Sequence, residues 1–170
     1  MTDEPDDEPR MIDIELGRIV LRDHSVAAPQ YIYLREQGGH RSFPIVIGFP
    51  EALELQRVVT GVRTERPMTH QLLLDTIHAL GARVGAVEIV DVQKNTFYAR
   101  IQLVNEAGEA LAELDARPSD SIALATRARC PLRVSEAVLE EVRVDEEADP
   151  LPGPPESEPT EDPGDETPDF

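Results

Sequence analysis

The sequence has little cysteine and no long apolar run. Cys130 is the only cysteine among 170 residues, so an internal disulfide and a cysteine-based metal site are both excluded. So few thiols suit a reducing compartment, and we expect a cytoplasmic protein. The apolar runs are no longer than a strand, so the sequence predicts no membrane-spanning segment and no membrane partner.

Several signatures of enzyme classes are also absent from the sequence. It has no glycine-rich phosphate loop, no His-x-x-x-His pair, no Cys-x-x-Cys and no Gly-x-Ser-x-Gly elbow. These absences argue against P-loop enzymes, zinc enzymes of the common types and serine hydrolases of the elbow type. The four histidines are scattered, and only His70 lies beside other informative residues.

The formal net charge of -18 lies mostly at the two ends of the chain. Residues 1–10 hold five acids and one arginine, and residues 144–170 hold eleven acids, seven prolines and no basic residue. We therefore expect a disordered acidic N-terminus at 1–10, one domain at 11–143, and a disordered acidic Pro-rich tail at 144–170. The domain itself has 18 acids and 15 bases, a net charge of -3, which leaves a nucleic-acid ligand possible through local arginine patches.

The hydrophobic patterns of the domain predict an α+β fold: an antiparallel or mixed β-sheet with about four short helices in a single domain. Strands are expected at residues 11–21, 30–35, 42–48, 84–92, 96–104, 110–115 and 131–134. Helices are expected from residue 49 onward and at residues 70–80, 119–129 and 135–143.

Details of the helices follow from their end residues and apolar spacing. Thr69 and Ser119 are suited to cap the second and third helices. The buried stripe of the second helix is expected to consist of Leu72, Leu73, Ile77 and Leu80.

The most informative motif joins a strand to a helix at residues 114–121. It places Asp115, Arg117, Ser119 and Asp120 at a helix N-terminus, where free amide groups and the helix dipole favour an anion. Asp115 and Asp120 are suited to share a divalent metal while Arg117 holds a phosphate with both arms of its guanidinium. The alternative is structural: Ser119 and Asp120 cap the helix, and Arg117 pairs with Asp115.

A second motif, at residues 63–70, brings two arginines and one histidine to the start of the second helix. As a functional element it is a phosphate-contact loop that includes Arg66 and His70. The alternative is a solvated linker that ends in a helix cap.

Four blocks of the domain resemble, in order and spacing, the bifunctional nuclease (DNase-RNase) domain family. They are FPIVIG at 43–48, RPMTHQLL at 66–73, NTFYAR at 95–100 and DARPSDSIALA at 115–125. The resemblance covers nearly all of residues 11–143. Family members often read Ile-Gly-Pro-Phe-Glu-Ala where this chain has IGFPEA at 47–52, a local exchange that keeps Glu51.

The resemblance implies hydrolysis of the phosphodiester bonds of DNA and RNA with little sequence specificity. Nucleases usually stabilise the developing charge with Mg²⁺ or Mn²⁺ held by carboxylates, and the alternative is catalysis by Arg and His without a metal. In the metal-assisted version Asp115 and Asp120 are the expected metal ligands, and Glu51 is an additional ligand or base. Arg117 is the expected phosphate clamp, and Arg66 and Ser119 are two further phosphate contacts. His70 is the expected general acid/base.

The alternative function is a noncatalytic binding or regulatory module of the same fold. Convergence of the candidate residues in one cleft favours the enzyme, and their dispersal favours the module. We also expect a homo-oligomer, with a dimer favoured, because open sheet edges and aliphatic residues on short helices are suited to pairing between copies.

Overall fold

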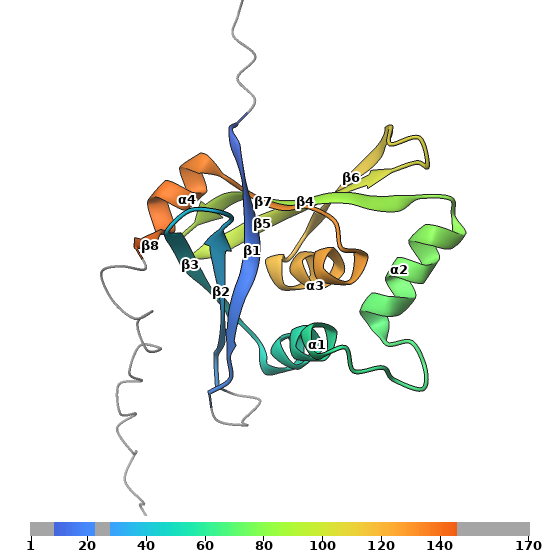
Figure 1. Cartoon of the computed structure of the whole chain (residues 1–170), viewed down its shortest axis with the longest axis horizontal. Coiled ribbons are helices and arrows are strands. Elements are labelled where there is room, and N and C mark those ends of the chain that lie inside the picture. Colours follow the sequence, from blue (N-terminus) through green and yellow to red (C-terminus); the bar gives the residue numbers. More distant parts are fainter. Residues whose placement is uncertain (1–8, 23–27, 146–170) are drawn as a thin grey trace, which may run out of the picture.

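One mixed sheet and four helices make up the described part of the chain, residues 9–22 and 28–145 of a computed structural model (Figure 1). The α+β prediction is confirmed, while most of the two predicted acidic tails lies outside the described residues. The strands are β1 Met11–Val20, β2 Gln30–Glu36, β3 Arg41–Ile47, β4 Arg83–Gln93, β5 Thr96–Val104, β6 Ala110–Ala116, β7 Leu132–Ser135 and β8 Val144–Asp145. The helices are α1 Phe49–Thr60, α2 Thr69–Ala79, α3 Pro118–Ala128 and α4 Glu136–Val142.

The strand order is β6-β5-β4-β7-β1-β2-β3-β8, so β7 joins two halves of the sheet. It pairs antiparallel with β1 through Met11 and Ser135, and parallel with β4 through Val87 and Leu132. Within each half, strands that follow one another in the sequence pair antiparallel, and β8 is added to β3 at the outer edge of one half. In Figure 1 the strands of the two halves run in clearly different directions.

Helix α3 lies at the centre of the molecule. Four consecutive residues, Ile122, Ala123, Leu124 and Ala125, are buried, which requires that the helix be enclosed on nearly all sides. It packs against α1, α2, β4 and β5, and Figure 1 shows it between the two halves of the sheet, above α1. Because α3 begins directly after β6, its N-terminus is fixed at one edge of this core.

Two predicted features of α2 are wrong. Its N-cap is Met68, with no capping bond from a side chain, and Thr69 is already helical. Of the expected apolar stripe only Ile77 is buried, together with Leu74, whereas Leu72, Leu73 and Leu80 are 57%, 44% and 80% exposed. The reason is that α2 packs with one side on α3 and β4, and the leucine-rich side faces outward.

The other helix starts and the end of the sheet also differ slightly from prediction. The N-cap of α3 is Arg117, not Ser119, and no side chain forms a capping bond there. Val144 and Asp145 pair with Ser42 and Arg41, so the sheet continues two residues into the segment predicted as a tail. Among the described helices, none is both long and apolar enough to cross a membrane.

A pair of substitutions in β3 tests where the core lies. Phe43 is fully buried and stacks on Phe97 with ring centroids 5.8 Å apart, so Phe43→Ala should lower the free energy of unfolding by about 3–5 kcal/mol. Val46, in the same strand, is 60% exposed, and Val46→Ala should cost less than about 1 kcal/mol. Urea denaturation measures both values, and equal losses would contradict the burial of Phe43.

Candidate active site

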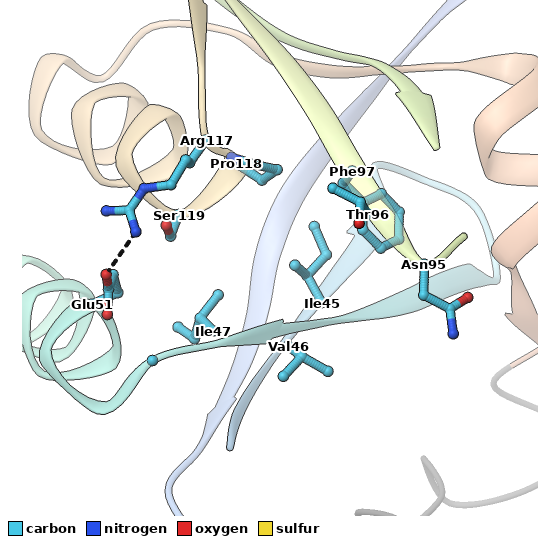
Figure 2. A pocket seen from close by; sticks show the side chains of 11 residues that line it. Ile45, Val46, Ile47, Glu51, Asn95, Thr96, Phe97, Arg117, Pro118 and Ser119 are labelled. Atoms are coloured by element: carbon cyan, nitrogen blue, oxygen red, sulfur yellow. Dashed lines mark ion pairs between the residues drawn. The ribbon is translucent and has the colours of Figure 1, made fainter. Parts of the chain in front are cut away.

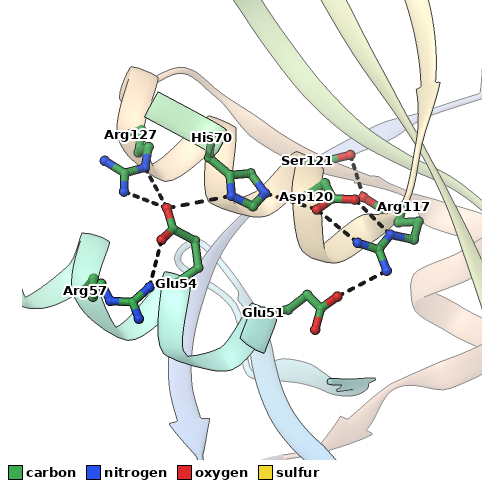
Figure 3. Close-up of polar contacts among 8 residues, drawn as sticks. All are labelled: Glu51, Glu54, Arg57, His70, Arg117, Asp120, Ser121 and Arg127. Carbon is green, nitrogen blue, oxygen red and sulfur yellow. Dashed lines mark hydrogen bonds and ion pairs between the residues drawn. The ribbon is translucent and has the colours of Figure 1, made fainter. Parts of the chain in front are cut away.

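Three helices begin beside one another, and each contributes a polar residue from its first turn. These residues are Glu51 of α1, His70 of α2 and Asp120 of α3 (Figure 3). Asp120 Oδ1 lies 3.0 Å from His70 Nε2, and Arg117 connects Asp120 to Glu51. Since the N-terminal end of a helix carries partial positive charge, the meeting point of three such ends favours an anion.

Arg117 is the most exposed member of this cluster, with 66% of its side chain accessible. Its Nε donates to Asp120 Oδ2 at 2.8 Å, and its Nη1 lies 3.1 Å from Glu51 Oε1. The pairing with Asp115 that the structural alternative required is not found. An exposed guanidinium on this junction can turn toward a ligand without breaking the core.

The glycine before the helix leaves room for the Glu51 carboxylate. A Cβ atom at Gly48 would collide with Glu51 Oε2, so the missing side chain leaves the space in which the carboxylate lies. Gly48 is the N-cap of α1, and Pro50 occupies the first turn, where its missing amide hydrogen costs nothing. The glycine thus lets Glu51 lie against its own helix start while facing Arg117.

A buried carboxylate, Glu54, lies one helical turn after Glu51. Arg127 donates to Glu54 Oε1 from Nε at 3.0 Å and from Nη2 at 2.6 Å, and Arg57 donates to Oε2 at 3.3 Å. Burial alone would raise the pKa of Glu54, but the bonds and charge of Arg127 outweigh it, and the pKa is lowered. The side chain is only 6% exposed, so it is a fixed negative charge beneath the site.

His70 lies between the buried and the exposed carboxylates. Its Nδ1 is 3.7 Å from Glu54 Oε1, and its Nε2 is bonded to Asp120. Burial would raise the pKa of Asp120, but hydrogen bonds from Arg117 and His70 more than offset it, and the pKa is lowered. A continuous polar chain therefore runs from Arg127 through Glu54, His70 and Asp120 to Arg117.

Sequence reasoning missed Glu54 and Arg127, although helical spacing contained a signal. Glu54 follows Glu51 by three positions, and Arg127 follows Asp120 by seven, so each pair shares a helix face. A charged residue on the face that an apolar pattern assigns to the core has to be paired. The two faces meet in the structure because α1 packs on α3.

The predicted site residues converge on a cleft of about 790 Å³. Five of them line it: Glu51, His70, Asp115, Arg117 and Asp120. Its remaining wall is mostly apolar and includes Phe49, Leu53, Met68, Leu73, Ile101, Leu114 and Leu124.

A smaller cleft of about 310 Å³ lies on the other side of the same ion pair (Figure 2). Glu51 and Arg117 belong to the walls of both clefts, and the smaller one also has Asn95, Phe97 and Ser119 in its wall. The Arg117 guanidinium is thus within reach of ligands on either side.

Two predicted residues lie apart from the larger cleft. Arg66 is exposed in the loop before α2 and lines neither cleft. Ser119 is 8% exposed and lines the smaller cleft but not the larger one. Asp115, at the end of β6, lines the larger cleft and has no ion pair among the described residues.

The carboxylates of the cluster are already paired with arginine and histidine side chains of the protein. Within residues 9–22 and 28–145, no group of three or more His, Cys, Asp or Glu side chains is placed to hold a metal ion. Both oxygens of Asp120 already accept bonds, one from Arg117 and one from His70. A divalent ion could therefore bind Asp120 only after Arg117 has turned away.

Comparisons with known proteins identify a family and several relatives of this chain. The family model described as "Bifunctional nuclease domain" matches residues 32–147, more than half of the chain. An uncharacterized protein of Mycobacterium tuberculosis is 41% identical over 127 residues, which cover 73% of this chain and 74% of that protein. "Bifunctional nuclease 1" of Oryza sativa subsp. japonica is 26% identical over 121 residues, or 70% of this chain and 37% of the plant protein. "Bifunctional nuclease 1" of Arabidopsis thaliana is 27% identical over 109 residues, covering 63% and 33% of the two chains.

The lowered pKa values predict how stability depends on pH. In the unfolded chain Glu54 and Asp120 take their ordinary pKa values of 4.5 and 3.8, so they bind protons more readily there than in the fold. Their contribution to stability is complete above these values and is lost as the pH falls through the lowered folded values. The free energy of unfolding should therefore decrease between about pH 6 and about pH 3.

The variant Glu54→Gln should flatten this dependence, because it removes the buried titrating group. Glu15→Gln is the matched control, since Glu15 is half exposed in a surface ion pair with Arg35. Urea denaturation at several pH values gives the slopes. A slope for Glu54→Gln as steep as that of the control would contradict the ionised state of Glu54.

Proposed function

The chain belongs to the bifunctional nuclease domain family, and from this premise we propose that it hydrolyses phosphodiester bonds of DNA and RNA. The observation that carries the proposal is the meeting of three helix N-termini at an exposed arginine between two clefts. The two plant relatives are named as nucleases, but the chain matches only about a third of each of them.

Arg117 is the proposed phosphate clamp. Its guanidinium presents two parallel N–H groups, which match two oxygens of a phosphate. Binding requires it to turn from Glu51 and Asp120 to the substrate, and its 66% exposure permits that movement. Because it borders both clefts, a bound phosphate would have one nucleoside on each side.

Tolerance of both sugars follows from this arrangement. Recognition through the phosphate reads neither the base edge nor the 2′-hydroxyl, so DNA and RNA bind alike. Ser119 supplies a further contact from the smaller cleft, and Arg66 binds a neighbouring phosphate of a longer strand. Both of these roles are part of the proposal.

In the proposed reaction one proton is taken from the attacking water and one is given to the leaving oxygen. Once Arg117 has turned to the phosphate, Glu51 Oε1 is released and accepts a proton from the attacking water. The water oxygen bonds to phosphorus as the bond to the leaving oxygen breaks. His70 acts in its doubly protonated form: it donates the Nε2 proton to that leaving oxygen when the substrate takes the place of Asp120. The neutral ring that remains keeps its Nδ1 proton, which faces Glu54.

A divalent ion is a separate proposal. Asp115 and Asp120 line the same cleft and would hold Mg²⁺ or Mn²⁺ after Arg117 has turned to the substrate. Such an ion stabilises the negative charge that develops on the phosphate oxygens. The movement of Arg117 would thus serve both substrate and metal.

One observation favours the noncatalytic alternative. The cluster is balanced, because the three guanidinium groups of Arg57, Arg117 and Arg127 face the three carboxylates of Glu51, Glu54 and Asp120. A network that satisfies itself is what a structural corner of a binding module would have. Activity assays separate the two functions.

Removing the clamp should abolish most of the activity. We expect Arg117→Ala to lower kcat/KM by about 10²–10³-fold on labelled single- and double-stranded DNA and RNA, because the charge that builds on the phosphate loses its partner. Arg35→Ala is the control, since Arg35 lies in a surface ion pair away from the clefts. If the unaltered chain cuts nothing with Mg²⁺, Mn²⁺ or EDTA, the binding module is the correct function.

Metal dependence is tested at Asp115. If Asp115 holds the ion, EDTA stops cleavage, and Asp115→Ala raises the concentration of Mn²⁺ needed for half-maximal rate at least tenfold. Glu113→Ala is the matched control, because Glu113 lies on the same strand in an exposed ion pair with Arg100. Cleavage that continues unchanged in EDTA would exclude the proposed ion.

A further inference from the structure

Each of the two clefts beside Arg117 has a phenylalanine in its wall. Phe49, the first residue of α1, lines the larger cleft, and Phe97 of β5 lines the smaller one (Figure 2). Both side chains are partly buried, whereas Phe43, the other phenylalanine of the described residues, is fully buried. The cleft volumes of about 790 and 310 Å³ lie in the range usual for small-molecule sites. Each cleft is therefore large enough for one planar ring system.

The larger cleft also has an apolar rim that is open to solvent. Met68 and Leu73, at the first half of α2, and Leu114 of β6 line this cleft and are 41%, 44% and 43% exposed. Ile101 and Leu124 line it too, and both are buried, so they form its floor. Exposed apolar side chains gathered in one concave site favour a ligand that has apolar surface of its own.

The hydrogen-bonding side chains of the larger cleft belong almost entirely to the polar cluster. Apart from Thr69 and Asp115, its polar lining residues are connected to one another by hydrogen bonds and ion pairs. They are Glu51, Glu54, Arg57, His70, Arg117 and Asp120. The apolar part of the wall therefore has few groups that read the edge of a base. It fits the flat face of a base, which all nucleobases share.

The position of the clefts separates the two nucleosides beside a bound phosphate. Arg117 and Glu51 line both clefts, and the rest of the two walls consists of different residues on either side of this ion pair. In a duplex, neighbouring bases of one strand stack on each other on the same side of the phosphate between them. A phosphate at Arg117 with one base in each cleft therefore requires a strand whose bases are unpaired and unstacked at that point.

Exposed cations continue this path at both ends. Arg66 comes two residues before Met68 of the larger cleft, and Lys94 comes directly before Asn95 of the smaller cleft. Neither Arg66 nor Lys94 has an ion pair within residues 9–22 and 28–145. Their charges match the phosphates that precede and follow the phosphate at Arg117 in a longer strand.

We propose that the two clefts are subsites for the two nucleobases beside the bound phosphate, so that the chain prefers single-stranded DNA and RNA to duplexes. One base packs flat against the apolar wall that includes Phe49 and Leu73, and the other packs beside Phe97. Packing against the face of a base tolerates every sequence. The inference rests on the proposed nuclease function for the phosphate at Arg117, but binding measurements test the base subsites without cleavage.

Fluorescence anisotropy with three labelled probes tests the base subsites in the full chain. The probes are a single strand of oligothymidylate, the same strand paired with oligoadenylate, and a strand of equal length made of stable abasic sugar phosphates. All carry phosphorothioate linkages, which slow hydrolysis during the measurement. The thymidylate strand should bind at least about tenfold more tightly than either other probe, because it alone offers free base faces, while the abasic strand keeps every phosphate.

Two pairs of leucines supply matched variants. Leu73 and Leu114 line the larger cleft, whereas Leu72 of the same helix and Leu111 of the same strand are 57% and 55% exposed and line neither cleft. The Leu73→Ala/Leu114→Ala variant should bind the thymidylate strand about tenfold more weakly and the abasic strand within about twofold of the unaltered chain. The Leu72→Ala/Leu111→Ala variant should change neither affinity. Circular dichroism spectra should show that both variants fold.

Equal affinity for the thymidylate and abasic strands, tighter binding of the duplex, or equal losses in the two double variants would overturn the proposal. Cleavage of the same probes with ordinary phosphodiester linkages separates this proposal from the nuclease function. Equal cleavage of all three would leave the nuclease function in place and overturn the base subsites. Preferred binding of the thymidylate strand without any cleavage would support the subsites and overturn the nuclease function.

Discussion

The arrangement of the helices depends on the ion pair between the buried carboxylate of Glu54 and Arg127. A charge out of contact with water must be paired, and Arg127 supplies the pair from another helix. The same guanidinium donates from Nη1 to Gln71 Oε1 at 3.0 Å, so a single arginine ties α1, α2 and α3 together. Any movement that separates α1 from α3 would remove both bonds of Arg127 to Glu54 and leave the carboxylate with the weaker contact to Arg57.

The polar cluster ranges from buried groups that are held in place to an exposed group that can move. Glu54 and Arg127 are 6% and 17% exposed, His70 is 18% exposed and Arg117 is 66% exposed. The groups that hold the helices are therefore separate from the group that meets the substrate in the proposed reaction. Such a division allows Arg117 to exchange partners while Glu54 and Arg127 keep the three helices in place.

Most of the fold and about half of the residues of the polar cluster could be predicted from the sequence. Alternating apolar residues and turn residues place every strand from β1 to β7 within a few positions, because those signals are local. The pair of Glu54 and Arg127 was not foreseen because its members are 73 positions apart and each reads as part of an amphipathic helix. Leu72, Leu73 and Leu80 were assigned to the core because periodicity predicts an apolar face but does not say which surface covers it. Arg66 illustrates the converse, since a place in a family motif does not bring a loop side chain into the cleft.

The short strand β7 has a consequence for the order in which the chain becomes functional. Among the strands of residues 9–22 and 28–145 it alone joins the two halves of the sheet, and it begins at Leu132, after the last residue of the polar cluster, Arg127. During synthesis each half can pair its own neighbouring strands early, but Glu51 belongs to one half and Asp120 follows the other. The ribosome therefore releases every chemical group of the site before the strand that joins the two halves, and assembly of the site has to wait for that late segment.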